Sequence, residues 1–339
     1  MSNRKARGGG KRTALIVLCV VLALLLVVLV SATVYLETLF GRLGRDIDES
    51  LSPEDLASIF QKETVPADFS GPNLDDVTMP SGPVATISQE DTLNILLVGQ
   101  DDGRSDAMIL ATFNPKTKTI TLTSFLRDMY VTIPGYYDDK LNHSYAYGLV
   151  NEGSGFRLLN ETLAYNFGVQ IDGNVGVGFE SFQQVIDMLG GVDVDLTEEE
   201  AQHMAYQLGA DISASGGVTH LNGANALRYA RIRKLDSDFG RTNRQRTVLE
   251  AIFNKVKGMG VTELNDLLMD VLPLVKTDMS NSQIMGYALE VFPLLLDCKM
   301  VTQQIPADGT WEGGSANGLS VLFVDFAANR DILHETLGD

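Results

Sequence analysis

Apolar residues gather in runs along this chain, and the longest run lies near its N-terminus. It extends without a charged residue from Ala14 to about Leu36. A helix rises about 1.5 Å per residue, so a helix of this length can cross a bilayer core of roughly 30 Å. Basic residues precede the run and Glu37 follows it, which predicts that residues 1–13 are cytoplasmic and that the rest is extracellular. The pattern predicts a single-pass protein of the cell membrane, anchored by residues 14–36.

A cleaved secretion signal is the alternative, because Val30-Ser31-Ala32 loosely resembles a small-residue cleavage site. The run is longer than the apolar part of a typical signal, which favours an uncleaved anchor. Residues 37–90 are rich in Asp, Glu, Ser, Pro and Gly and are predicted to form a stalk or linker. Residues 91–339 are then the extracellular domain. Apart from Cys298, the only cysteine lies in the apolar run, so no disulfide is expected within that domain.

Beyond the stalk, short continuous apolar runs alternate with segments of helical periodicity. The runs predict strands at Leu93–Val98, Met108–Phe113, Thr119–Phe125, Val175–Phe179, Val192–Leu196, Met300–Ile305 and Val321–Phe326. The helical spacing predicts helices over about 156–167, 180–189, 243–257, 262–272 and 280–296. The Asn114–Lys118 segment between the second and third strands indicates a hairpin. Strands alternating with helices predict an α/β domain with a mixed central β-sheet flanked by helices.

Charge narrows the range of partners. The chain has 44 acidic and 26 basic residues and a formal net charge of -18. Such a surface repels nucleic acid and anionic membranes, so no nucleic-acid partner is expected. A restricted cationic pocket remains compatible with this balance.

Seven of the basic residues lie together in the segment 228–246. Arg231 and Arg233 are two positions apart and would project to one face of an extended chain. Arg241, Arg244 and Gln245 would share one face of a helix, with Asp238 and Gly240 in the joining loop. A solvated basic helix is the alternative. Because guanidinium groups match phosphate oxygens in a bidentate way, we interpret the segment as a phosphate site.

Two further polar segments follow predicted strands. The turn Gly99–Asp106 carries three carboxylates and Arg104, and oxygen ligands of this kind suit Mg²⁺ next to a phosphate. A solvated polar turn explains it equally well. Arg127 and Asp128 follow the third strand, where a plain ion pair is the simpler reading.

Other candidates are weaker. No Walker sequence, complete dinucleotide fingerprint, metal-spaced histidines or nucleophile signature is present. His143 and Tyr145 lie in an aromatic stretch that could line a pocket or belong to the core. Any chemistry would therefore rest on cations and a metal ion, as in phosphoryl transfer.

These motifs, in this order behind a membrane helix, resemble the LytR-CpsA-Psr (LCP) family. The resemblance covers residues 92–257 and rests on several motifs: Gly99-Gln-Asp101, Ser105-Asp-Ala107, Ser124-Phe-Leu-Arg-Asp128, Lys140-Leu-Asn142, Gly190–Val194, Ala226–Lys234, Asp238-Phe-Gly-Arg241 and Arg244-Gln-Arg246. The chain departs from the family pattern at Gln100, where a Ser is usual, and at Leu126, where a Pro is usual.

The resemblance implies a membrane-anchored phosphotransferase of cell wall biogenesis. Members move a glycopolymer phosphate, such as that of teichoic acid, capsule or another wall polysaccharide, from a polyprenyl-pyrophosphate carrier to peptidoglycan. The resemblance also implies that the lipid lies in an apolar tunnel and that its pyrophosphate lies in an arginine-lined mouth with Mg²⁺ (or Mn²⁺).

The same resemblance assigns roles to individual residues. Asp101 and Asp106 would hold the metal, although the short loop leaves Asp102 as an alternative to Asp101. Asp238 would orient the arginines. The expected pyrophosphate ligands are Arg104, Arg127, Arg231, Arg233, Arg241 and Gln245. The residues expected to be catalytic are Arg127, Arg231, Arg233 and Asp106, with Asp106 or Asp101 as the base for the acceptor hydroxyl.

Two other functions remain open on the sequence. The arginines could bind a polyprenyl pyrophosphate without turnover, as in a sensor. The chain could also be a regulatory protein that attenuates transcription. The predicted extracellular orientation, the acidic surface and the lack of a DNA-binding helix pattern argue against attenuation.

Overall fold

We analysed a computed structural model of the chain, which describes residues 35–45, 77–87, 92–101, 103–236, 238–291, 293–294 and 297–337. Two compact units are distinguished, Met1–Leu43 and Gly44–Asp339. The first is described only over residues 35–43, which form a helical stretch at 35–40 and a turn. The predicted anchor at 14–36 lies, except for its last two residues, outside the described residues. No helix among the described segments is long and apolar enough to cross a membrane.

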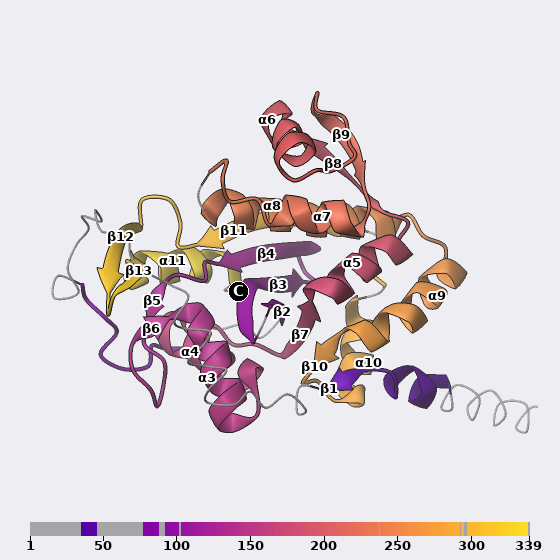
Figure 1. Cartoon of the computed structure of the whole chain (residues 1–339). Helices are drawn as coiled ribbons and strands as arrows, with labels where there is room; N and C mark the ends of the chain where they lie inside the picture. The colour runs from indigo at the N-terminus through magenta and orange to yellow at the C-terminus, as the bar shows by residue number, and fades with distance from the viewer. Residues whose placement is uncertain are drawn as a thin grey trace, which may run out of the picture. The chain divides into compact units, whose positions relative to one another are not determined.

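The second unit is built on a seven-stranded mixed sheet, as predicted (Figure 1). Its order is β1 (Gly44–Arg45), β10 (Lys276–Thr277), β7 (Gly173–Gly178), β2 (Leu93–Asp101), β3 (Arg104–Asn114), β4 (Thr119–Phe125) and β11 (Lys299–Ile305). Parallel pairs join β1 to β10, β7 to β2 and β4 to β11, and the remaining neighbours are antiparallel. The strands nearest the centre are apolar because helices cover both faces.

The predicted hairpin is confirmed as β3 and β4. Asn114 lies opposite Thr119 across its turn. The side-chain Oδ1 of Asn114 accepts hydrogen bonds from the backbone N–H groups of Lys116, at 3.0 Å, and Thr117, at 3.1 Å. This Asx turn is the reason that a polar pentapeptide reverses the chain here.

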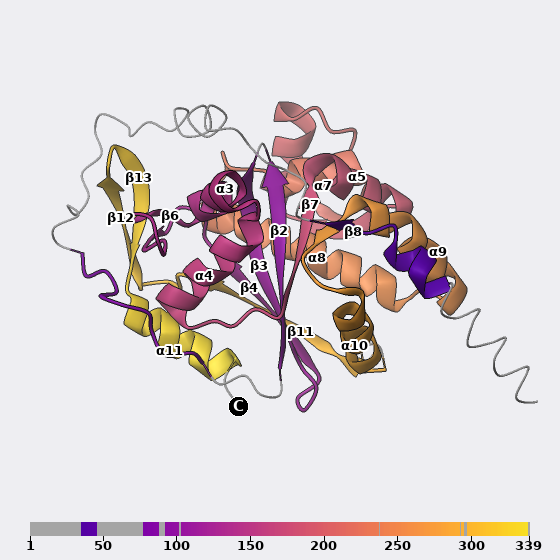
Figure 2. The same cartoon turned by 90° about the horizontal axis from the view of Figure 1, so that it is seen from below.

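One face of the sheet is covered by α3 (Leu141–Glu152), α4 (Gly155–Phe167) and α11 (Phe326–Leu337) (Figure 2). These helices and the sheet share the larger hydrophobic core. Tyr145 is 1% exposed and packs edge-on against Phe156, so the aromatic stretch around it belongs to the core. The sequence did not predict α3, because its first nine residues are all buried and show no polar face.

The opposite face is covered by α5 (Phe179–Met188), α7 (Gly223–Ala230) and α8 (Asp238–Lys257) (Figure 1). The helices α9 (Val261–Val271) and α10 (Asn281–Val291) follow α8, with η4 (Leu272–Leu274) between them. The predicted strand Val192–Leu196 is present as β8, but it pairs with β9 (Gly217–Leu221) in a separate two-stranded sheet. That sheet, with α6 (Glu198–Gln202) and η3 (His203–Gln207), has its own hydrophobic cluster.

Several segments complete the domain around one end of the sheet. A hairpin of β12 (Trp311–Ala316) and β13 (Leu319–Val324) lies beside a second pair, β5 (Tyr130–Val131) and β6 (Asp139–Lys140). Residues 77–87, assigned to the stalk from the sequence, also pack onto this unit. Within them Ile87 is 5% exposed and its N–H donates to the carbonyl of Gly168 at 2.9 Å. The folded unit therefore extends into the predicted linker.

Candidate functional site

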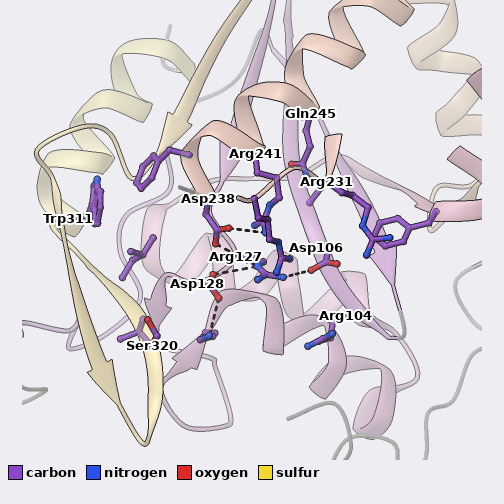
Figure 3. A pocket seen from close by; sticks show the side chains of 17 residues that line it. Arg104, Asp106, Arg127, Asp128, Arg231, Asp238, Arg241, Gln245, Trp311 and Ser320 are labelled. Atoms are coloured by element: carbon purple, nitrogen blue, oxygen red, sulfur yellow. Dashed lines mark hydrogen bonds and ion pairs between the residues drawn. The ribbon is translucent and has the colours of Figure 1, made fainter. Parts of the chain in front are cut away.

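A pocket of about 800 Å³ lies where several strands and helices end together. Its walls come from the β2–β3 hairpin, the segment after β4, the starts of α3, α5 and α8, the loop after α7, and the β12–β13 hairpin. Figure 3 shows their side chains converging on a common space. The predicted ligands Arg104, Arg127, Arg231, Arg233, Arg241 and Gln245 all line it, as do Asp106 and Asp238. The structure thus brings together predicted residues that are more than 140 positions apart.

An irregularity in β3 directs the side chains of Arg104 and Asp106 into the pocket. Gly99 pairs with Ala107, but Gln100 pairs with Ser105, so Asp106 is an extra residue in the register. A bulge of this kind reverses the alternation of side chains. Arg104 and Asp106 consequently lie on the same face as Ala107, which lines the pocket with them. The buried Ser105 lies on the other face, where its hydroxyl is 3.4 Å from the sulfur of Met108.

Arg127 lies at the centre of a carboxylate cluster. Its Nη1 donates to Oδ1 of Asp106 at 2.5 Å, and its Nε is 3.4 Å from Oδ2 of Asp128 and 3.9 Å from Oδ2 of Asp238. Burial disfavours the charge of this guanidinium, but the three carboxylates outweigh burial and raise its pKa above the ordinary value. Arg127 is therefore held firmly and remains charged at any physiological pH.

Asp128 and Asp238 respond to this cluster in opposite directions. Burial would raise the pKa of Asp128, but a hydrogen bond from Asp238 and the charges of Arg127 and Lys140 lower it. Lys140 Nζ is 3.0 Å from Oδ1 of Asp128 and is itself buried. Burial and the neighbouring Asp128 raise the pKa of Asp238. The same cluster therefore shifts the pKa values of its two neighbouring carboxyl groups in opposite directions.

The loop after α7 differs from its prediction. Arg231 is the C-cap of α7, and Arg233 lies in irregular chain, so the extended strand-like segment expected here is not formed. Both side chains nevertheless reach the pocket. The guanidinium of Arg231 lies 4.2 Å above the ring of Phe179, at the start of α5, in a cation–π contact. The common direction of the two arginines comes from this loop rather than from strand alternation.

Helix α8 also starts earlier than predicted, at Asp238, so Asp238 and Gly240 belong to the helix and not to a loop. Arg241 Nη1 is 2.9 Å from Oδ1 of Asp238. Arg241 and Gln245 face the pocket, whereas Arg244 faces α6 and is buried there against Glu200. The expectation that Arg244 shares their face is therefore wrong.

Among the side chains that the structure describes, cations exceed carboxylates in the pocket lining. Six cationic side chains, Lys140 included, face three carboxylates there. Burial and the nearby charge of Arg127 lower the pKa of Arg233, and they lower that of Arg241 to about 10. Among the described residues, Nε of Arg241 has no hydrogen-bond acceptor, whereas its Nη1 contacts the carboxylate of Asp238. Excess positive charge with an unused donor is the arrangement expected of an anion site.

An apolar cavity of about 270 Å³ adjoins this pocket. The two share Ala107, Phe179, Arg231 and Gln245 in their linings. The cavity lies between the sheet and the helices α5, α7 and α8. Its remaining walls are almost entirely aliphatic or aromatic: Leu97, Val98, Gly99, Ile109, Val175, Val177, Phe182, Val185, Leu227, Ala230, Leu249, Ile252, Val271 and Val275. We refer to the pocket of about 800 Å³ as the mouth. Because of the bulge at Asp106, the mouth and the apolar cavity lie on the same face of β3.

The predicted metal ligands are only partly described. Asp101 ends β2 opposite Arg104, close to the bulge, but its side chain and the whole of Asp102 lie outside the described residues. Among the residues whose side chains are placed, no three of His, Cys, Asp or Glu could hold a metal ion together. One or two carboxylates with phosphate oxygens are the usual ligands of Mg²⁺ in such sites. The carboxylate of Asp106, which lines the pocket at this hairpin, fits that chemistry.

Sequence reasoning missed part of the lining. The sequence pattern indicates no site role for Lys140, Phe179, Trp311 or the β13 segment Ser320–Leu322, all of which line the pocket. Lys140 follows two acidic residues in the sequence, which gives no sign that it is buried. The β13 segment is held in place by a hydrogen bond from Leu322 N to the carbonyl of Asp128, at 2.8 Å. No local pattern reveals that long-range contact.

Residues 63–336 match the LytR_cpsA_psr family. A curated relative from Oceanobacillus iheyensis, named polyisoprenyl-teichoic acid–peptidoglycan teichoic acid transferase TagU, is 37% identical over 204 residues. That alignment covers 58% of this chain and 62% of the relative, just under two thirds of its length.

Solved structures agree with the fold. A structure of TagT bound to LIIa-WTA superposes with a TM-score of 0.60 and 30% identity, covering 74% of this chain and 90% of that one. A second structure, of YwtF (TagT) with bound octaprenyl pyrophosphate lipid, gives a TM-score of 0.57 and 28% identity over 74% of this chain and 90% of that one.

Proposed function

Because the chain belongs to the LytR_cpsA_psr family, we propose that it is a glycopolymer transferase that uses a polyprenyl-pyrophosphate-linked donor. The acceptor in this proposal is peptidoglycan, and the glycopolymer is of the teichoic acid kind or a related wall polysaccharide. The name of the similar TagU protein and the lipid bound in the similar TagT structure support the proposal.

One observation carries this function, namely that an arginine-lined mouth opens into an apolar cavity. A polyprenyl pyrophosphate has the same two parts, a multiply charged head and a hydrocarbon tail. The mouth holds the excess of cations, and the adjoining cavity is lined by aliphatic and aromatic side chains. Burial of such a tail contributes roughly 25 cal/mol per Å² of apolar surface, so head and tail would both favour binding.

The residues of the mouth have distinct roles in transfer. Arg231, Arg233 and Arg241 bind the phosphate oxygens, and Nε of Arg241 has no other acceptor among the described residues. As the acceptor hydroxyl attacks, its oxygen forms a bond to the distal phosphorus, and the bond from that phosphorus to the lipid phosphate breaks. Fixed cations stabilise the negative charge that builds on the leaving lipid phosphate.

The hydroxyl proton needs an acceptor within the pocket, and Asp106 is our candidate. Its carboxylate lines the pocket and is oriented by the 2.5 Å contact with Arg127. Arg127 is in turn fixed by Asp128 and Asp238. Asp238 orients Arg241 as well, through the 2.9 Å ion pair within α8. Asp101, at the adjacent strand end, remains the alternative base.

We also propose that Asp106, with Asp101 or Asp102, holds Mg²⁺ (or Mn²⁺) at the mouth. When bound, the ion would neutralise charge on the pyrophosphate oxygens. Residues 14–36 remain the predicted membrane anchor. The proposal places the chain in the cell membrane as a single-pass protein, with its N-terminus cytoplasmic and its transferase domain extracellular, where the lipid-linked donor and peptidoglycan would meet.

A matched pair of neighbouring substitutions tests this function. Arg233→Ala should lower the rate of transfer about 100- to 1,000-fold, the effect of removing one preorganised donor from a developing charge. Lys234→Ala is the control, because Lys234 is exposed and does not line the pocket. Transfer would be measured with the full-length protein, a polyprenyl-pyrophosphate-linked glycopolymer and peptidoglycan.

Three outcomes are informative. Loss of transfer in Arg233→Ala alone supports the transferase. Equal activity in both variants contradicts the assignment of the mouth. Tight binding of the lipid pyrophosphate without any transfer by the wild type would show a non-catalytic binder instead.

A further inference from the structure

A second pocket, with a volume of about 810 Å³, lies beside the proposed transfer site. Its walls are residues 77–84, the β12–β13 hairpin and the start of α11, which lie side by side in both views (Figures 1 and 2). The volume falls within the range of roughly 300 to 1,000 Å³ that is typical of ligand sites. No role of the transfer reaction described above uses this pocket.

Trp311 joins the second pocket to the first. It lines both of them, at the first residue of β12. Its indole stacks on the ring of Phe239, with centroids 4.7 Å apart and an angle of 26° between the planes. Figure 3 shows Trp311 at one edge of the first pocket, with Arg231 at the other. Arg231 is shared with the apolar cavity, so cavity and second pocket lie on opposite sides of the mouth.

The lining of the second pocket combines aromatic, acidic and basic groups. Its lining residues include the aromatic Trp311, the acidic Glu312 and Asp325, and the basic Arg330. A pyranose ring has an apolar C–H face that packs on aromatic rings. Its hydroxyl and acetamido N–H groups donate to carboxylates, and carboxylates on its lactyl or peptide substituents pair with arginine. This combination matches an amino-sugar glycan better than a purely apolar ligand.

We infer that the second pocket binds the acceptor, a peptidoglycan glycan strand, and that Trp311 marks the passage from it to the mouth. The inference rests on the proposed function, since it names the site of the second substrate. A strand needs to place one hydroxyl at the pyrophosphate while its neighbouring sugars are held outside the mouth. A subsite on the side away from the lipid cavity lets donor and acceptor bind together without competing.

The test uses a glycan alone. A soluble GlcNAc–MurNAc octasaccharide is titrated into full-length protein by calorimetry, and the fluorescence of Trp311, the only tryptophan in the chain, is recorded in parallel. Saturable binding with a change in fluorescence is expected. The double variant Glu312→Ala/Arg330→Ala should bind at least tenfold more weakly. Asp331→Ala is the matched control, because Asp331 is exposed on α11 beside Arg330 but does not line the pocket.

Several results would overturn the inference. These are no binding of the octasaccharide, unchanged affinity in the double variant, or an equal loss of affinity in Asp331→Ala. In the transfer reaction, the double variant should raise KM for the glycan acceptor at least tenfold and leave kcat within twofold. An unchanged KM would also contradict the assignment.

A competition experiment separates this inference from the proposed function. Farnesyl pyrophosphate, a short soluble analogue of the donor, should bind wild-type protein without weakening the octasaccharide. Competition would place the glycan in the mouth and would refute a separate subsite. If farnesyl pyrophosphate fails to bind while the octasaccharide binds as expected, the donor assignment fails and the glycan site stands.

Discussion

Two arginines on helix α8, three positions apart, have opposite surroundings. Arg244 faces the small subdomain formed by β8, α6, η3 and β9. There its Nε donates to Glu200 at 2.8 Å, while its Nη2 donates to Asp236 at 2.5 Å and its Nη1 to the carbonyl of Ile232 at 3.0 Å. Arg241 faces the mouth and has Asp238 as an ion-pair partner at 2.9 Å. Both are 3% exposed, so burial alone does not distinguish them.

The difference lies in how completely each charge is compensated. Burial disfavours the charge of Arg244, but Asp236 and Glu200 outweigh it and raise its pKa. At Arg241 burial and the charge of Arg127 prevail and lower the pKa to about 10. An arginine whose charge is balanced by nearby carboxylates stabilises the fold. An arginine whose charge is only partly balanced can bind an anionic ligand. The same residue type therefore serves structure on one face of the helix and binding on the other.

The largest expected effect is on stability at Arg244. Arg244→Met keeps the aliphatic stem but leaves Glu200 and the carbonyl of Ile232 without their partner. Breaking a buried pair in this way should lower the free energy of unfolding by roughly 3 kcal/mol. Urea unfolding of the full chain measures it. Arg241→Met is the matched control and should lose less than about 1 kcal/mol. Equal losses in both variants would remove the distinction between the two faces.

Affinity should show the reverse order. Arg241→Met removes a charged donor from the mouth, and loss of one hydrogen bond to a charged group costs about 1.5–3 kcal/mol. Binding of farnesyl pyrophosphate should then weaken about 10- to 100-fold by calorimetry. Folded Arg244→Met should bind within a fewfold of wild type. If Arg244→Met loses as much affinity for farnesyl pyrophosphate as Arg241→Met, ligand binding at the mouth depends on the contacts of Arg244 with the β8–β9 subdomain, and the two regions are not independent.

The smallest effect is a dependence on pH. Arg241 has a pKa of about 10 without ligand, lowered by burial and by Arg127, so it is protonated below that pH. Its contribution to anion binding should be constant from pH 7 to 9 and should fall as the pH rises through 10. The affinity ratio between wild type and Arg241→Met for farnesyl pyrophosphate should shrink in that interval. An affinity ratio that stays constant up to pH 11 would contradict the lowered pKa of Arg241.

Local patterns located much of the fold and most of the candidate site. The apolar runs found β2, β3, β4 and β11, and the hairpin was recognised because Asn114 has the residue type that its turn requires. Helix α3 escaped detection because it is buried on every side and lacks an amphipathic period. The helical spacing placed the start of α8 too late, because Asp238 and Gly240 are typical of loops.

Gly240 lies against the carboxylate that pairs with Arg244. A Cβ at this position would overlap the carboxylate of Asp236, which forms a salt bridge to Arg244. A side chain at position 240 would therefore have to displace Asp236, although the spacing of residues in this segment gives no sign of that contact.

The sequence by itself determined the chemistry of this protein: a clustered set of arginines, a carboxylate-rich turn and a chain that alternates strands with helices. These follow from residue type and local periodicity. The tertiary structure decided which cations face the pocket and which pair within the fold, because folding brings distant charges such as Glu200 to Arg244 and Arg127 to Arg241. It also decided, through a one-residue bulge at Asp106, that the polar mouth and the apolar cavity share one face of the sheet.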